Sequence, residues 1–119
     1  MWHELEGVIQ GVIVEDERVE IATSAGTWRF KPYGDCCAYA YVHEPKTAQA
    51  ELEALIGQII VKAEKVIGPE LDSTNSDAIE VRDVIFYKLQ AEKGAATVTL
   101  YVDHNGYYGG ALEGGKVEP

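Results

Sequence analysis

The chain has 119 residues and a mass of 13.0 kDa, which predicts one domain spanning residues 1–119, since single domains usually contain about 100–150 residues. Its 46% hydrophobic and 25% charged residues are typical of a soluble globular protein and exclude a largely disordered chain. Twenty acidic against ten basic residues give a net charge of −10, which disfavours direct nucleic-acid binding. This charge either simply keeps a small protein soluble or favours a partner protein with a basic surface.

The first third of the chain predicts three antiparallel strands. Residues 8–14 (VIQGVIV) are rich in β-branched side chains, and Gly11 marks a bulge within them. Residues 19–23 alternate between apolar and polar side chains, as in a half-buried strand. In residues 28–31 two aromatic side chains alternate with two basic ones, which completes an antiparallel meander.

A fourth strand and the only helix are predicted next. The strand covers residues 35–43 (DCCAYAYVH), and the helix covers residues 48–56, with Thr47 as its N-cap and Gly57 as its C-cap. Alternation along this strand gives two faces, which carry Cys36, Ala38, Ala40 and Val42 on one side and Cys37, Tyr39, Tyr41 and His43 on the other. The small residues of the first face predict that the helix packs over it.

The second half of the chain predicts a strand over residues 58–67, a polar linker over 68–76, and a hairpin of residues 81–90 and 96–102. Residues 113–119 are expected to form a frayed tail. These elements together predict an α+β fold: a mostly antiparallel β-sheet of six to eight strands with one packed α-helix.

The two cysteines are adjacent, so they form no ordinary disulfide, and their presence fits a reducing compartment. Asp35 precedes Cys36 and Cys37, and three interpretations remain open: buried packing, a ligand or metal role, and nucleophilic catalysis. The three histidines stand at no recognisable metal-ligand spacing from the cysteines, so no metal and no cofactor are predicted. No segment has the length of a membrane span and no signal peptide is recognised, so a cytoplasmic protein without a membrane partner is expected.

Tyrosines supply the second group of candidate site residues. Asn105 and Gly106 predict a tight turn after His104, followed by Tyr107 and Tyr108, which either pack on the sheet or stand exposed for binding. Tyr39 and Tyr41 share a sheet face that has the chemistry to stack a base, although the acidic field opposes a phosphate-bearing ligand. The predicted binding residues are therefore Asp35, Tyr39, Tyr41, His104, Asn105, Tyr107 and Tyr108.

Three short stretches carry a resemblance to a known family: residues 34–37 (GDCC), 86–89 (FYKL) and 105–108 (NGYY). With them, the chain from about Leu5 to Leu112 resembles a family of small phage and prophage proteins of unknown function. The resemblance implies that the protein is encoded by a bacteriophage or an integrated element, and it implies no particular chemistry.

Four hypotheses about function follow. The first is a non-enzymatic inhibitor that binds a basic host defence complex stoichiometrically, as nucleic-acid-mimicking anti-CRISPR proteins do. The second is a sponge for a nucleotide signal, which would combine Asp35, Tyr107 and Tyr108 with Arg29 or Lys88 in a basic pocket within the acidic surface. The third, an enzyme, needs a thiol within hydrogen-bond reach of a histidine. The fourth is a virion or assembly accessory; a homodimer formed through a sheet edge fits any of them.

Overall fold

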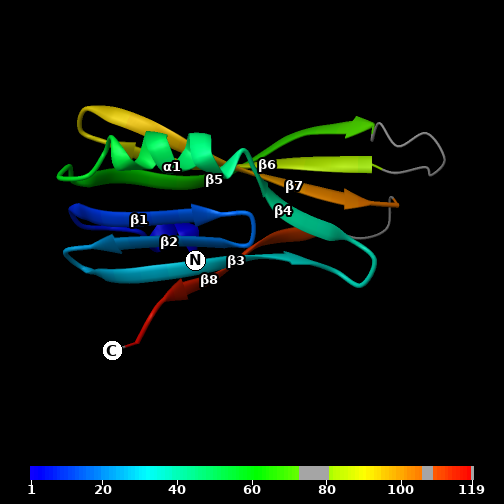
Figure 1. The fold of residues 1–119 in the computed structure, drawn as a ribbon, viewed down its shortest axis with the longest axis horizontal. Coiled ribbons are helices and arrows are strands. Elements are labelled where there is room, and N and C mark those ends of the chain that lie inside the picture. Colours follow the sequence, from blue (N-terminus) through cyan, green and yellow to red (C-terminus); the bar gives the residue numbers. More distant parts are fainter. Residues whose placement is uncertain (73–80, 106–108, 119) are drawn as a thin grey trace.

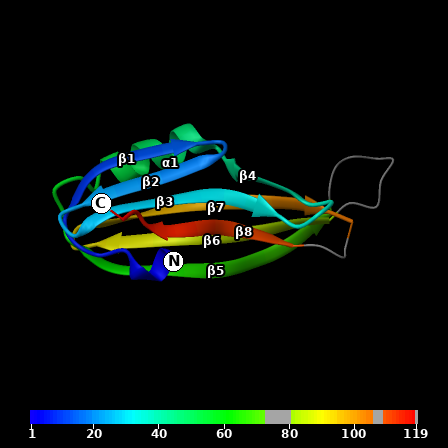
Figure 2. The same ribbon diagram turned by 90° about the horizontal axis from the view of Figure 1, so that it is seen from below.

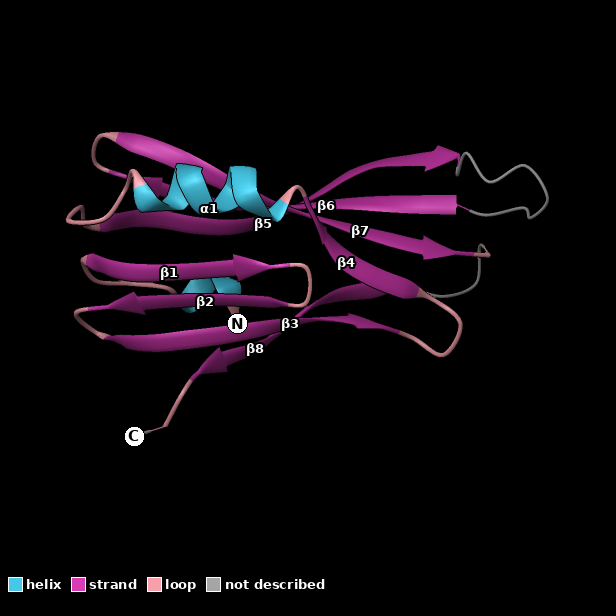
Figure 3. Ribbon diagram, viewed as in Figure 1, coloured by secondary structure: helices cyan, strands magenta, loops and turns pink. Residues whose placement is uncertain are grey.

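The structure is a computed structural model that describes residues 1–72, 81–105 and 109–118. These residues form eight β-strands, one α-helix and one short 3-10 helix (Figures 1 and 3). Every strand pair is antiparallel, which confirms the expected sheet-dominated α+β fold with one packed helix. The strands are divided between two sheets, however, where the sequence predicted one. No helix in the described residues is long and apolar enough to cross a membrane.

Sheet one contains β1 (Ile9–Glu15), β2 (Arg18–Thr23), β3 (Gly26–Gly34) and β8 (Gly110–Lys116), in the order β1-β2-β3-β8. The first three strands form the predicted meander. Strand β8 comes from the other end of the chain and pairs with β3 along its whole length. Residues 113–116, which were expected to lie in a frayed tail, are therefore part of the sheet.

Sheet two contains β4 (Tyr39–His43), β5 (Ile60–Asp72), β6 (Val81–Ala91) and β7 (Gly94–His104), in the order β4-β7-β6-β5. The predicted hairpin is present as β6 and β7. Strand β5 is longer than predicted, because it continues through the first residues of the supposed linker. Its register with β6 shifts near those residues, between Ile67 and Glu70, so a bulge carries the strand past a glycine and a proline.

The two sheets enclose one hydrophobic core, to which both contribute alternate side chains. Trp28 and Phe30 of β3 point into it from sheet one, and Tyr87 of β6 points into it from sheet two. The Tyr87 hydroxyl accepts a hydrogen bond of 2.8 Å from the backbone N–H of Leu112 in β8, so this side chain connects the sheets through a polar contact as well as through packing. Burial raises the pKa of the Tyr87 hydroxyl, which keeps it neutral.

The N-terminal 3-10 helix η1 (Trp2–Glu4) lies beside β5 (Figure 2) and also contacts β8, so it bridges the gap between these edge strands of the two sheets. Trp2 is 4% exposed, and its ring contacts Phe30 and Tyr87 at centroid distances of 5.4 and 5.5 Å. The Trp2 Nε1–H donates a hydrogen bond of 2.9 Å to the carbonyl of Lys88. One side chain thus fills this gap between the sheets.

Helix α1 (Pro45–Glu53) fills the opposite gap, where it packs against β1 and β7. The Gln49 side chain accepts a hydrogen bond from Val14 N–H at 2.6 Å and donates one to the Val12 carbonyl at 2.9 Å, as a neighbouring strand would. A Glu51 oxygen lies 3.4 Å from the N–H of Thr97 in β7. The helix therefore satisfies polar backbone groups on the edges of both sheets.

The predictions for this region need three corrections. The helix begins at Pro45 and ends at Glu53, because Pro45 is already its first residue and the N-cap is Glu44, where Thr47 was expected. It covers the gap between the sheets instead of the small residues of β4. Residues 35–38 form a turn, so β4 is shorter than the predicted strand.

Candidate functional site

The predicted site residues come from two segments that meet at one end of the molecule. The Asp35 N–H donates to the carbonyl of Gly109 at 2.9 Å, and the Gly109 N–H lies 3.4 Å from a carboxylate oxygen of Asp35. Asn105 directly follows β7 and is exposed. Two predicted site residues, Tyr107 and Tyr108, lie outside the described residues. The turn at Asp35 is thus held to Gly109, the residue before β8, by one main-chain hydrogen bond and one contact of the Asp35 side chain.

His104, although predicted as a binding residue, is the last residue of β7 and is buried, with 6% of its surface exposed. Its Nε2 lies 2.8 Å from a carboxylate oxygen of Asp83 on the neighbouring strand β6. The alternation that buries Val102 also turns His104 toward the interior. Its observed contact connects β6 to β7, and the imidazole is not presented to solvent.

The outer side of sheet two carries a group of aromatic and charged side chains that we call the tyrosine face. Its members come from β4, β6 and β7 and are Tyr39, Tyr41, His43, Arg82, Tyr101 and Asp103. Tyr39 and Tyr41 contact each other at a centroid distance of 5.1 Å, as expected for alternate residues of one strand. Tyr39 is 62% exposed, so its ring protrudes from the surface.

Tyr101 lies at the centre of the tyrosine face. The His43 ring stacks on it at 4.2 Å with an interplanar angle of 16°, the Tyr41 ring meets it edge-on at 5.9 Å, and the Arg82 guanidinium lies over it at 4.7 Å. In the strand register, His43 of β4 lies opposite Thr99, two residues before Tyr101 on β7. Arg82 of β6 lies opposite Asp103, two residues after Tyr101. The ring surfaces of Tyr101 that would stack a nucleobase are therefore already occupied by protein groups.

A bidentate ion pair with Asp103 fixes the Arg82 side chain on the tyrosine face. Its Nε and Nη2 contact the two oxygens of Asp103 at 2.8 and 3.3 Å, a geometry that restricts the guanidinium to one orientation. The Tyr41 hydroxyl lies 3.4 Å from the same carboxylate. Burial, followed by the negative charge of Asp103, raises the pKa of Tyr41, so the phenol stays neutral and available as a donor.

Sequence reasoning selected Tyr39 and Tyr41 for this face but missed three of their neighbours, Arg82, Tyr101 and Asp103. The alternation of β7 did contain a signal, because it placed Tyr101 opposite the buried side of that strand. The strand order was the missing information. Only the pairing β4-β7-β6 brings Tyr41 and Arg82 to the two sides of Tyr101.

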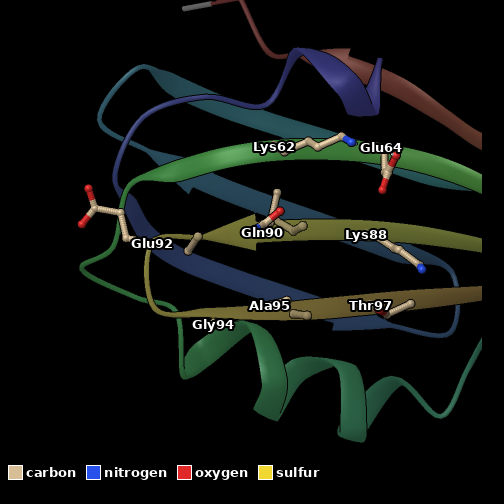
Figure 4. A pocket seen from close by; sticks show the side chains of 11 residues that line it. Lys62, Glu64, Lys88, Gln90, Glu92, Gly94, Ala95 and Thr97 are labelled. Atoms are coloured by element: carbon tan, nitrogen blue, oxygen red, sulfur yellow. Dashed lines mark ion pairs between the residues drawn. The ribbon is translucent and has the colours of Figure 1, made fainter.

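The outer side of sheet two continues past the tyrosine face into a shallow hollow of about 470 Å³ (Figure 4). Lys62 and Lys88 lie along it together with Glu64, Gln90 and Thr97. Lys62 forms an ion pair of 3.4 Å with Glu64. The hollow is thus polar and of mixed charge, and it extends the exposed surface of this sheet without adding a basic site.

A second hollow, of about 530 Å³, lies along β3 and β8 of sheet one and is rich in positive charge. Arg29, Lys31 and Lys116 border it, with Glu113 as the acidic residue of its lining. Gly114 and Gly115 have no side chains to fill the space, and Tyr33 is 49% exposed at its border. Arg29 is partly neutralised by an ion pair of 3.1 Å with Glu20.

Both cysteines are exposed free thiols, so the interpretation that they pack in the core is wrong. Their Sγ atoms lie 3.5 Å apart, and contact with Cys36 raises the pKa of the Cys37 thiol. The enzyme hypothesis required a thiol bonded to a histidine. Among the described residues no hydrogen bond joins either thiol to His43 or His104.

Comparison with known proteins gives one match. The model of a family described as a domain of unknown function (DUF7448) matches residues 4–113, which is most of the chain. Neither the comparison with curated proteins nor that with solved structures found a match.

Proposed function

Starting from a chain that belongs to the DUF7448 family of domains of unknown function, we propose that the protein acts by binding a basic partner protein stoichiometrically through the tyrosine face. The observation that carries this proposal is the cluster of partly buried aromatic and guanidinium groups on the outer side of sheet two, from which the exposed ring of Tyr39 protrudes. Tyrosine and arginine are enriched among the residues that contribute most to binding at protein interfaces, and tyrosine buries a large area at a small entropic cost.

The charge of the protein indicates the class of partner. A net charge of −10 attracts basic surfaces and accelerates encounter with them. His43 and Arg82 already lie over the ring of Tyr101, where a nucleobase would stack. The tyrosine face is therefore better suited to binding a protein than to stacking a base. We propose that the partner is a nucleic-acid-binding complex of host defence, and that a phage or prophage protein of this kind blocks its groove in the host cytoplasm.

Removing the aromatic side chains tests this proposal. In capture experiments from bacterial host lysate, the double variant Tyr39→Ala with Tyr101→Ala is expected to retain its partner at least about tenfold less than the wild type, since interface hot spots contribute about 2 kcal/mol or more each. The matched control is Tyr33→Ala, which removes an exposed tyrosine from sheet one and is expected to bind as the wild type does. Equal capture by all three proteins would contradict the proposal.

Reversing charges outside the tyrosine face distinguishes long-range electrostatic attraction of the partner from direct contact with it. Asp16→Lys with Glu17→Lys lies in the β1–β2 turn, which contributes no residue to the tyrosine face, and changes the net charge from −10 to −6. The double variant is expected to associate with the partner more slowly and with a weaker salt dependence, while its dissociation rate stays nearly unchanged.

Competition with nucleic acid tests whether the protein blocks the partner's groove. If the captured partner still binds its nucleic acid in the presence of excess wild-type protein, the proposal of groove blocking is wrong, although the protein–protein contact itself can still be real.

The positively charged hollow along β3 and β8 supports a second candidate function, the binding of a nucleotide signal. Three cations border this hollow in a protein with twice as many acidic as basic residues, and an exposed tyrosine adjoins them. With cyclic di-AMP as the probe, Lys31→Ala is expected to weaken binding about tenfold, the loss of one charge-assisted hydrogen bond. Lys93→Ala, which removes a lysine from the β6–β7 turn, is the control. Absence of heat in calorimetric titration of the wild type would remove this candidate.

A further inference from the structure

The turn between β3 and β4 presents two thiols to solvent, which is unusual because free cysteines are among the most buried residues of proteins. Cys36 and Cys37 are its two central residues, and the carbonyl of Asp35 accepts the Ala38 N–H across it at 2.6 Å. Neither side chain packs in the core. Their exposure is therefore not explained by the stability of the fold.

The turn is held in place from both sides. Asp35 bonds to the carbonyl of Gly109, which precedes β8, and a side chain at Gly34 would collide with the backbone of Ala38. These contacts fix the backbone that carries the two thiols. With their Sγ atoms 3.5 Å apart, the cysteines form a pre-arranged pair of soft donors.

Two outcomes are open to such a pair, a disulfide or a shared metal ion. The Cα atoms of adjacent residues are about 3.8 Å apart, whereas disulfides usually need about 4.4–6.8 Å. A bond between Cys36 and Cys37 would therefore be strained and easily reduced. Two thiolates on one soft ion avoid this constraint, because a shared ion holds the sulfur atoms farther apart than a disulfide does, and rotation of the two exposed side chains can widen their present separation of 3.5 Å.

The number of ligands near the two cysteines indicates which metal ion they can bind. Zinc is usually held by three or four protein ligands, and the described residues contain no group of three or more His, Cys, Asp or Glu side chains that could hold a metal ion. A soft ion that is satisfied by two thiolates fits the pair better. We propose that Cys36 and Cys37 form a binding site for a soft monovalent metal ion, with Cu⁺ as the representative ion. On binding, each thiol releases its proton to water and one Cu–S bond forms to each sulfur, while copper remains Cu⁺.

The test is an anaerobic titration of the reduced, full-length protein with Cu⁺ in competition with the chromogenic chelator bicinchoninate. The wild type is expected to withdraw one Cu⁺ per chain. Cys36→Ser and Cys37→Ser are each expected to bind on the order of 100-fold more weakly, because one of the two soft ligands is lost. Glu92→Gln, which removes an exposed carboxylate from the β6–β7 turn, is the control and is expected to stay within about threefold of the wild type.

Circular dichroism spectra of the serine variants should match the wild type, because both replaced side chains are exposed. In a parallel arm, Zn²⁺ is expected to compete at least about 100-fold less well than Cu⁺, since only two ligands are present. A wild type that withdraws no Cu⁺, a double serine variant that binds as the wild type does, or Zn²⁺ binding as tight as that of Cu⁺ would each overturn the proposal. Its failure leaves binding through the tyrosine face unaffected, because the two sites use different residues.

Discussion

Replacing Trp2 by alanine is expected to lower the free energy of unfolding by about 3–5 kcal/mol, the usual cost of removing a buried tryptophan. The side chain contacts Phe30 of sheet one and Tyr87 of sheet two, so its loss leaves a cavity between the sheets. It also leaves the carbonyl of Lys88 without the indole donor. Equilibrium unfolding in urea measures the change.

Two further variants make this result specific. Trp2→Phe keeps an aromatic ring and loses only the indole hydrogen bond and some area, so a loss of about 1–2 kcal/mol is expected. His3→Ala changes an exposed residue of the same short helix and should stay within about 0.5 kcal/mol of the wild type. A stability loss below about 1 kcal/mol for Trp2→Ala would mean that η1 does not hold the sheets together.

The second large effect is expected at Gly114 in β8. Its φ of +144° is a conformation that side chains rarely permit, and an added Cβ would collide with the carbonyl oxygen of Arg29 on β3. Gly114→Ala is therefore expected to cost about 2–4 kcal/mol, as strain or as broken pairing between β3 and β8. Thermal unfolding followed by circular dichroism detects it as a lower Tm.

Gly11 provides the matched control for this substitution. It also lies in an edge strand of sheet one, but an added Cβ there would meet no atom within 4 Å, and its φ is not positive. Gly11→Ala should be neutral or stabilising by up to about 1 kcal/mol, because it restricts the unfolded chain. Equal destabilisation by both substitutions would show that the sheet does not distinguish the two glycines.

Prediction from the sequence was most successful where hydrophobic alternation is strong. The hairpin of β6 and β7 and the strands β2 and β3 of the meander bury alternate side chains, so their pattern is visible in the sequence itself. Strand β8 lacks this signal. Three of its seven residues are glycines, and its place in the sheet depends on backbone pairing with a strand about 80 residues earlier in the chain.

The candidate sites likewise contain residues that a local sequence pattern predicts and residues whose position depends on long-range strand pairing. Tyr39 and Tyr41 could be assigned to one face from their spacing alone, whereas their neighbour Arg82 required the strand order. The cysteine pair was misassigned for a related reason. Alternation continues evenly through residues 35–43, but the contact of Asp35 with Gly109, 74 residues away, turns the chain before β4 begins.

Helix α1 has a consequence for how the protein survives heat and crowding. Through Gln49 and Glu51 it occupies backbone groups of β1 and β7 that would otherwise be open to a strand of another molecule. Open strand edges template intermolecular pairing, from which aggregates grow. Aggregation is therefore expected to begin from molecules in which residues 45–53 have detached while both sheets are still folded, and any change that stabilises this one short helix should improve solubility during expression and storage.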